Sequence, residues 1–195
     1  MSLGPVSSYT QPIDNRPPSF DYNRIEGVRN NPNVTPEFIQ QVEAMAERLG
    51  TRPEYLMAVM SFESGLDPTA VNGTSGATGL IQFLDSTARG LGTSTAELKQ
   101  MSATEQLQYV EKYLEPFKGK LDTLEGVYTS VLSGSPKADP DTTLFSSGSA
   151  AYAQNSGLDL DHDGRITSAE ATQKVRDEVD GALPPPLPQQ PLRYY

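Results

Sequence analysis

A run of apolar residues at positions 55–62 constrains the fold of this 195-residue chain more than any other feature. Its sequence, YLMAVMSF, is apolar on nearly every face of a helix, and such a helix is stable only inside a core. The run is too short to cross a membrane, which takes about 20 apolar residues. We therefore expect a buried central helix that ends at Glu63-Ser64-Gly65.

Helix-start and helix-stop signals frame this segment. Thr35-Pro36 predicts the start of a helix that stops at Gly50, and Thr51 with Glu54 predicts a capping box at the start of the central helix. The two signals together predict two consecutive helices joined by a short turn.

Further helices are expected downstream. One is expected directly after Gly79, with its inward face formed by Leu80, Phe83, Leu84 and Leu91. Three more capping signals have the same spacing: Ser94/Glu97, Ser102/Glu105 and Asp122/Glu125. No alternating strand pattern extends beyond a few residues, so the predicted fold class is all-α.

Composition divides the chain into four parts. Residues 1–33 are rich in Pro, Ser and Asn and predict an extended N-terminal arm, and residues 182–195 predict a Pro-rich tail. Between them we expect a helical domain over 34–135 and a C-terminal segment over 136–181. No signal peptide is visible at the N-terminus.

Charge and residue usage exclude several function classes. The net charge of −10 argues against nucleic acid as a partner, because phosphate binding needs clustered Lys and Arg. The absence of Cys excludes disulfides and thiolate catalysis, and the single His, His162, leaves little scope for a His-activated nucleophile. A glycan with neutral sugars imposes no charge requirement, so a polysaccharide partner stays open.

Glu63 is the candidate catalytic residue. It ends the most apolar helix, where burial and the negative end of the helix dipole both disfavour its charged form and raise its pKa. A carboxylic acid that stays protonated near neutral pH is what cleavage of a glycosidic bond requires. The Gly- and Thr-rich segment 72–79 that follows lets backbone approach a ligand closely.

The wider motif resembles the catalytic signature of soluble lytic transglycosylases. It consists of ESGLDPTA at 63–70, SGATGLIQ at 75–82 and STA at 86–88, against the family pattern E-S-x-x-x-P-x-A, G-A-x-G-L-M-Q and T-A. The resemblance covers residues 34–135 and implies a lysozyme-like helical domain with a sugar-binding groove. The sequence LSGSP after Tyr128 is similar to phage-borne relatives.

The resemblance also implies roles for individual residues. Glu63 corresponds to the general acid and base, and Gln82 to a glutamine that contacts the glycan. Tyr128 corresponds to a tyrosine close to the catalytic Glu. The remaining substrate-binding candidates lie in the loop between these motifs: Asn72, Ser75 and Gly79.

The implied reaction is cleavage of the β-1,4 bond between N-acetylmuramic acid (MurNAc) and N-acetylglucosamine (GlcNAc) of peptidoglycan, with a 1,6-anhydro product and no cofactor for catalysis. A hydrolytic muramidase on the same fold is the first alternative, and it would need a second carboxylate. Asp67 and Asp85 are the nearest candidates in sequence, but Asp67-Pro68 is typical of a turn and Asp85 of a solvated helix position.

A second alternative is a structural virion component with a vestigial glycan-binding domain. The arm, the tail and the phage-like segment motivate it, and they predict protein partners in a virion or secretion assembly. The expected location is therefore a virion, or the periplasm and cell wall after export. A virion protein that opens the cell wall would combine both functions.

Residues 159–170, DLDHDGRITSAE, match an EF-hand calcium loop at every ligand position. Gly164 occupies the sharp turn and Ile166 the apolar position, while His162 occupies a position that binds no metal. The predicted ligands of a structural Ca²⁺ are Asp159, Asp161, Asp163, the Arg165 carbonyl, Thr167 and Glu170. The helix after the loop is predicted from Ala169 to about Val179, whereas no clear helix precedes it.

Overall fold

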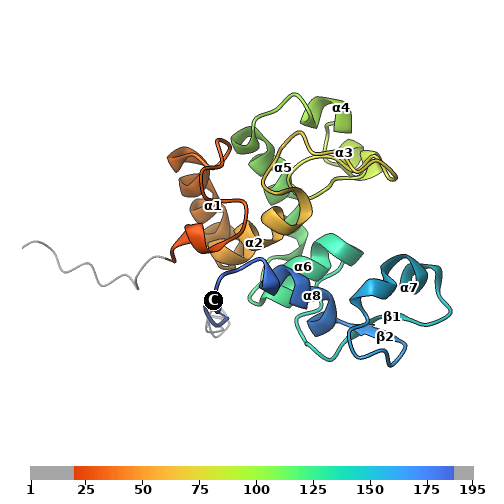
Figure 1. Cartoon of the computed structure of the whole chain (residues 1–195). Helices are drawn as coiled ribbons and strands as arrows, with labels where there is room; N and C mark the ends of the chain where they lie inside the picture. Colours follow the sequence, from red (N-terminus) through yellow and green to blue (C-terminus); the bar gives the residue numbers. More distant parts are fainter. Residues whose placement is uncertain (1–19, 187–195) are drawn as a thin grey trace, which may run out of the picture.

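The computed structural model describes residues 20–186, which form a mainly helical body with one small sheet (Figure 1). The α-helices of this part are α1 (Pro36–Leu49), α2 (Pro53–Ser64), α3 (Asp85–Gly90), α4 (Thr95–Leu98), α5 (Ala103–Leu114), α6 (Leu124–Ser133), α7 (Ala150–Asn155) and α8 (Ser168–Asp177). Short 3-10 turns lie at Tyr22–Arg24, Glu115–Phe117 and Ser156–Leu158. None of the described helices is long and apolar enough to cross a membrane.

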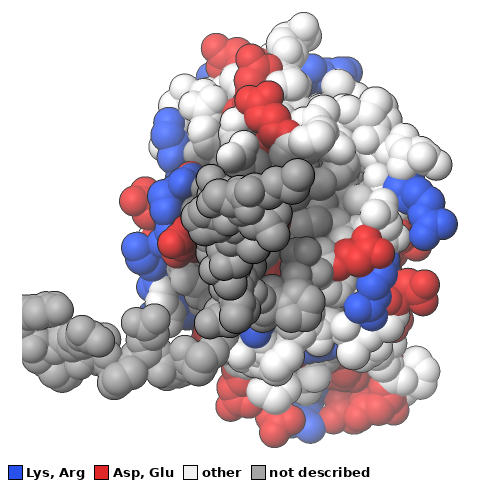
Figure 2. All heavy atoms as spheres, turned by 90° about the vertical axis from the view of Figure 1, so that its left-hand side faces the viewer, with Lys and Arg blue, Asp and Glu red and all other residues white. Residues whose placement is uncertain are grey.

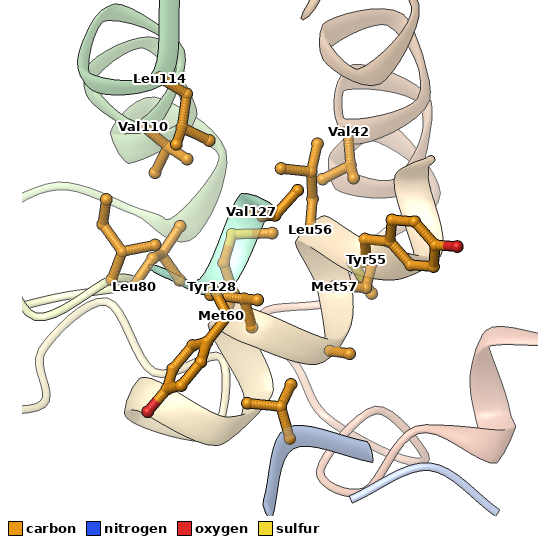
Figure 3. Packing of buried hydrophobic residues seen from close by; sticks show 14 of the residues in the cluster. Val42, Tyr55, Leu56, Met57, Met60, Leu80, Val110, Leu114, Val127 and Tyr128 are labelled. Atoms are coloured by element: carbon orange, nitrogen blue, oxygen red, sulfur yellow. The ribbon is translucent and has the colours of Figure 1, made fainter. Parts of the chain in front are cut away.

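Helix α2 is the central element of the core, as its composition predicts. Six consecutive residues, Tyr55 to Met60, are at most 2% exposed. The helix contacts α1, α6 and α8, and Figure 3 shows Leu56 between Val42 and Val127. The surrounding helices therefore hold α2 from several sides, which fixes the position of its last turn.

Several predicted helix boundaries are confirmed. Thr35 accepts a hydrogen bond from the Phe38 amide at the start of α1, and Gly50 ends that helix in the left-handed conformation. Ser94 caps α4, and Ser102 forms a complete capping box with Glu105 on α5.

Two of the predicted capping boxes are wrong. Helix α2 begins at Pro53 with Arg52 as its N-cap, because a proline without an N–H suits the first helical position, so Thr51 and Glu54 lie out of capping register. Helix α6 is capped by Thr123, whose hydroxyl accepts from the Gly126 amide, instead of by Asp122.

The helix predicted directly after Gly79 is also wrong in its start. Gly79 and Gln82 have φ values of 82° and 53°, and residues 79–82 form turns that end in a backbone pairing between Thr78 and Phe83. Left-handed residues interrupt a helix, so α3 begins only at Asp85. Leu84 is consequently 48% exposed instead of facing inward.

A two-stranded antiparallel sheet, which the sequence pattern did not predict, lies in the C-terminal segment. Strand β1 (Thr143–Ser146) pairs with β2 (Arg165–Thr167), with Phe145 opposite Ile166. The strands are too short to show a clear alternation. Helix α8 follows β2 directly and contacts both α2 and α6, so the C-terminal segment packs on the helical domain (Figure 1).

The described ends of the chain pack on the same body. Ile25 and Val28 are buried, and the Ile25 backbone pairs with Val179, so residues 20–33 do not form an extended arm. At the other end, the Tyr55 hydroxyl donates to the Pro184 carbonyl at 2.7 Å. The rest of the predicted arm (1–19) and of the predicted tail (187–195) lies outside the described residues.

Candidate active site

The candidate active site is built around Glu63 in the last turn of α2. Gly65 ends the helix at φ 64°, and its amide donates to the Ser61 carbonyl at 2.6 Å. The Ser64 hydroxyl donates to the carbonyls of Met60 and Leu80, which joins the helix end to the loop that precedes α3. Glu63, partly buried, therefore projects from a helix end that is fixed on both sides.

Burial raises the pKa of Glu63 from 4.5 to about 7. Desolvation favours the neutral acid, and the position at the C-terminal end of a helix acts in the same direction. About half of the molecules therefore carry a protonated Glu63 at neutral pH, which is the state that a general acid needs.

Two tyrosines lie near this carboxyl group. Burial, and then the charge of Glu63, raises the pKa of Tyr128 on α6 and of Tyr113 on α5. The Tyr128 ring meets Phe62 edge to face, with 5.6 Å between ring centroids, and its hydroxyl points away from the labelled core side chains in Figure 3. The structure therefore places Tyr128 near Glu63, while the contact of Tyr128 with substrate stays a prediction.

Tyr113 is a site residue that sequence reasoning missed. Its hydroxyl donates to the Ser130 carbonyl at 2.7 Å, and its ring makes edge contacts with Phe83 and Phe117. Nothing in the sequence separates this tyrosine from Tyr109 one turn earlier, since both lie on the same side of α5. Only the approach of α5 to the end of α2 gives Tyr113 a place near Glu63.

Asn72 and Ser75 shape the loop that precedes Gly79. The Asn72 side-chain oxygen accepts from the amides of Thr74 and Ser75 at 3.0 Å each, and the Ser75 hydroxyl oxygen accepts from the Ala77 amide at 3.2 Å. Both residues are exposed. These contacts give each of them a local structural role, while their contact with substrate stays a prediction.

Gly79 and Gln82 occupy strained positions in the turn before α3. A Cβ on Gly79 would lie 2.4 Å from Oε1 of Gln106, so only glycine fits there. The side-chain nitrogen of Gln82, Nε2, donates to the Gly79 carbonyl at 3.1 Å, so this side chain is bound to its own turn. The role of Gln82 in glycan binding stays a prediction.

Gln106 organises this region, and sequence reasoning missed it as well. It is fully buried on α5; its Oε1 accepts from the Leu80 amide, and its Nε2 donates to the carbonyls of Pro68 and Leu98. The signal that could have identified it is a polar residue on the apolar face of α5, between Ala103 and Val110.

Both candidates for a second carboxylate make hydrogen bonds to other residues. Asp67 accepts from the amide and hydroxyl of Thr69 at 2.8 Å each, as expected of a turn. Asp85 binds Arg89 and Thr95, and the Arg89 guanidinium lowers its pKa. Burial raises the pKa of Glu63, and neither Asp67 nor Asp85 contributes to the shift.

The predicted calcium ligands lie between α7 and the first turn of α8, which contains Glu170. Carboxylate oxygens of Asp159, Asp161 and Glu170 all lie within 4.8 Å of one another. Asp163 instead pairs with Arg165, with 2.8 Å between the charged atoms. Thr167 caps α8 by accepting from the Glu170 amide.

Where the described residues are visible in Figure 2, Lys and Arg lie among Asp and Glu.

Comparison with known families bears on the helical domain. No solved structure matches the chain significantly. Residues 40–129 match the family model described as Transglycosylase SLT domain. The match contains Glu63, the loop 72–79, Gln82 and Tyr128, and it ends before the acidic loop 159–170. Residues 40–129 are thus similar to the lytic transglycosylases of the lysozyme-like superfamily, which supports peptidoglycan as the substrate and lytic transglycosylase activity in general.

Proposed function

We propose that this chain cleaves the β-1,4 bond between MurNAc and GlcNAc of peptidoglycan, with Glu63 as both the acid and the base. The observation that carries the proposal is the partly buried carboxyl group at the end of α2, whose pKa burial raises to about 7. Such a group can donate a proton at neutral pH and later accept one. The family match supports the same substrate.

The proposed reaction has two proton transfers. Glu63 first donates its proton to the glycosidic oxygen as the bond from MurNAc C1 to that oxygen breaks. The resulting carboxylate then accepts the proton of the C6 hydroxyl, and O6 of the same MurNAc bonds to C1. The products are a free GlcNAc 4-hydroxyl and a 1,6-anhydro ring, so no water is consumed and Glu63 ends protonated.

A hydrolytic reaction on the same fold is the alternative. It requires a second carboxylate to hold water or to act as a nucleophile, about 5–9.5 Å from the first. Asp67 and Asp85 are both engaged in hydrogen bonds within their own segments. Intramolecular closure by the C6 hydroxyl needs only Glu63, and we therefore favour it.

Mass spectrometry of the soluble products from purified peptidoglycan tests this proposal. Products lighter by one water than the hydrolytic fragments are expected from the wild type. Glu63→Gln is expected to lower the rate by about 10²- to 10⁴-fold, the usual contribution of a general acid. Glu47→Gln, an exposed residue on α1 with the same change of charge, is the matched control.

Each other outcome has a definite meaning. Reducing-end products that disappear in Glu63→Gln would identify a hydrolytic muramidase. Equal product release by the wild type and Glu63→Gln would remove Glu63 from the mechanism. Glycan binding without products from either protein would identify a vestigial binding domain.

We further propose that this activity opens the cell wall locally for a phage particle or a secretion apparatus, in a virion or in the periplasm. The support is the phage-like LSGSP segment after Tyr128 and the Pro-rich composition of both ends. Deletion of residues 1–19 and 187–195 is expected to leave cleavage of purified peptidoglycan unchanged and to abolish incorporation into the assembly. Unchanged incorporation would contradict the docking role of the two ends.

A further inference from the structure

The acidic loop at 159–170 carries an arrangement that the proposed glycosidic reaction does not use. Oxygens of Asp159, Asp161 and Glu170 lie within 4.8 Å of one another. Carboxylates at this separation repel one another, by about 1 kcal/mol per pair in water and by more where water is displaced. A bound cation would remove this repulsion.

Asp159 supplies an independent observation that points to a ligand. It is only 2% exposed, and its Oδ1 is buried without a hydrogen-bond partner among the described residues. Its other oxygen, Oδ2, accepts from the Tyr152 hydroxyl at 2.6 Å and from the Gly164 amide at 3.0 Å. The side chain is thus oriented through one oxygen, while the other is desolvated and unpaired, which is unfavourable unless a ligand binds it.

The backbone of the loop is folded as a cation loop requires. His162 and Gly164 have φ values of 62° and 86°, which turns the chain tightly around the acidic side chains. Ile166 is fully buried in β2 and pairs with Phe145 of β1, so the second half of the loop is fixed by the sheet. Glu170 lies in the first turn of α8, and its Oε1 accepts from the Leu160 amide at 3.0 Å, which closes the loop.

Asp163 departs from this arrangement. Its Oδ1 accepts from the Arg165 amide at 2.7 Å, and its Oδ2 binds the Arg165 guanidinium. The guanidinium neutralises the negative charge of Asp163, which would otherwise attract a cation. Arg165 therefore competes with a cation for Asp163, while its own backbone carbonyl lies at the position that ligates calcium in such loops.

We propose that residues 159–170 bind one Ca²⁺ through the carboxylates of Asp159, Asp161 and Glu170 and the Arg165 carbonyl, with Asp163 and Thr167 completing the site. An all-oxygen donor set of mixed carboxylates and carbonyl is the chemistry that calcium prefers. Magnesium binds less well, because it needs near-octahedral geometry at shorter distances and retains its waters.

Calcium at this position stabilises more than the loop. Glu170 belongs to α8, and the buried residues of α8 (Ser168, Ala171, Thr172 and Val175) are part of the same core as α2 and α6. The Arg176 side chain also pairs with Glu125 of α6. A ligand that binds only the folded loop therefore raises the unfolding temperature of the helical body as well.

The first experiment is isothermal titration calorimetry on the full chain, stripped of metal, with CaCl₂ and without glycan. One Ca²⁺ per chain is expected to bind. Asp161→Asn keeps an oxygen for its hydrogen bond from the Asp163 amide but removes a charge, and it is expected to weaken binding at least about tenfold. Glu47→Gln, with the same charge change on α1, is expected to bind like the wild type.

Arg165→Ala gives a change of the opposite sign. It keeps the backbone carbonyl, removes a positive charge from the site and releases Asp163, so calcium is expected to bind several-fold more tightly. A merely acidic surface would not distinguish Asp161→Asn from Glu47→Gln. Equal affinities for those two variants, or an equal heat of binding with MgCl₂, would overturn the proposal.

Two further readouts place the ion and its effect. The chain has no Trp, so Tb³⁺ emission excited through tyrosine is expected to depend on Tyr152, and Tyr152→Phe is expected to abolish it. A calcium concentration a hundredfold above Kd is expected to raise Tm by about 5–10 °C. Unchanged emission in Tyr152→Phe, or the same Tm with calcium and with chelator, would contradict the site. These measurements use no peptidoglycan, so they stand or fall separately from the proposed reaction.

Discussion

Glu63→Gln should stabilise the protein at neutral and alkaline pH, although it lowers the rate of cleavage. The wild-type Glu63 holds its proton more tightly in the folded protein, with a pKa of about 7, than in the unfolded chain, with a pKa near 4.5. The stability due to this group is therefore fully present below pH of about 4.5, declines as the pH rises, and is lost above about pH 7. Glutamine has no proton to lose, so the variant avoids this decline.

The magnitude follows from the two pKa values. At about 1.4 kcal/mol for each tenfold difference in proton affinity, the step from 4.5 to about 7 corresponds to roughly 3 kcal/mol. Partial exposure of Glu63 to solvent reduces this to about 2–3 kcal/mol. The free energy of unfolding of Glu63→Gln, minus that of the wild type, is therefore expected to rise by this amount between pH 4.5 and pH of about 8.

Urea denaturation of both proteins at a series of pH values, at constant ionic strength and constant calcium, measures this difference. Glu47→Gln is the matched control, because it makes the same change of charge at an exposed position on α1. The same pH dependence for Glu63→Gln and Glu47→Gln would refute the reasoning, since it would mean that burial at the end of α2 does not disfavour the Glu63 carboxylate.

Three further predictions concern the rate and the core. The kcat/KM for peptidoglycan should fall about tenfold per pH unit above about pH 7, as Glu63 loses its proton, and a rate that is constant to pH 9 would contradict its role as the acid. Gln106→Leu should destabilise the protein by about 2–4 kcal/mol in urea denaturation, because it removes the side-chain partner of the buried Leu80 amide and of the Pro68 carbonyl. Arg176→Ala should lower the free energy of unfolding by about 1–3 kcal/mol by the same measurement, because it leaves the partly buried Glu125 without its cation. The variant should keep a single unfolding transition. A separate transition for the C-terminal segment would show that α8 is not part of the same cooperative unit.

The sequence determined the central helix, several of its neighbours and the candidate acid. Continuous apolar character over 55–62 requires burial whatever the neighbours are, and a Glu at the end of such a helix is desolvated by the same residues. Thr35, Gly50 and Ser102 act through hydrogen bonds within a few residues, so their effect could be predicted locally. The spacing of the acidic loop is equally local, although its calcium stays a proposal.

Where two local signals competed, the predicted helix start was wrong. Pro53 overrode the Thr51/Glu54 pattern, and Thr123 overrode Asp122. The turn at 79–82 depends on contacts with a distant helix. Oε1 of Gln106 on α5 accepts a hydrogen bond from the Leu80 amide, and the Gln106 side chain leaves no room for a side chain at Gly79. A periodicity of apolar residues contains no information about that contact.

Only the tertiary structure could place Tyr113 beside Glu63, dock α8 on α2 and leave Asp159 Oδ1 buried without a partner. Each of these features joins segments that are separated along the chain or depends on burial by them. The sequence fixes which groups are available and how each segment folds locally. Distances and solvent exposure between segments are set by how the helices pack, and these decide the pKa of Glu63 and the geometry of the acidic loop.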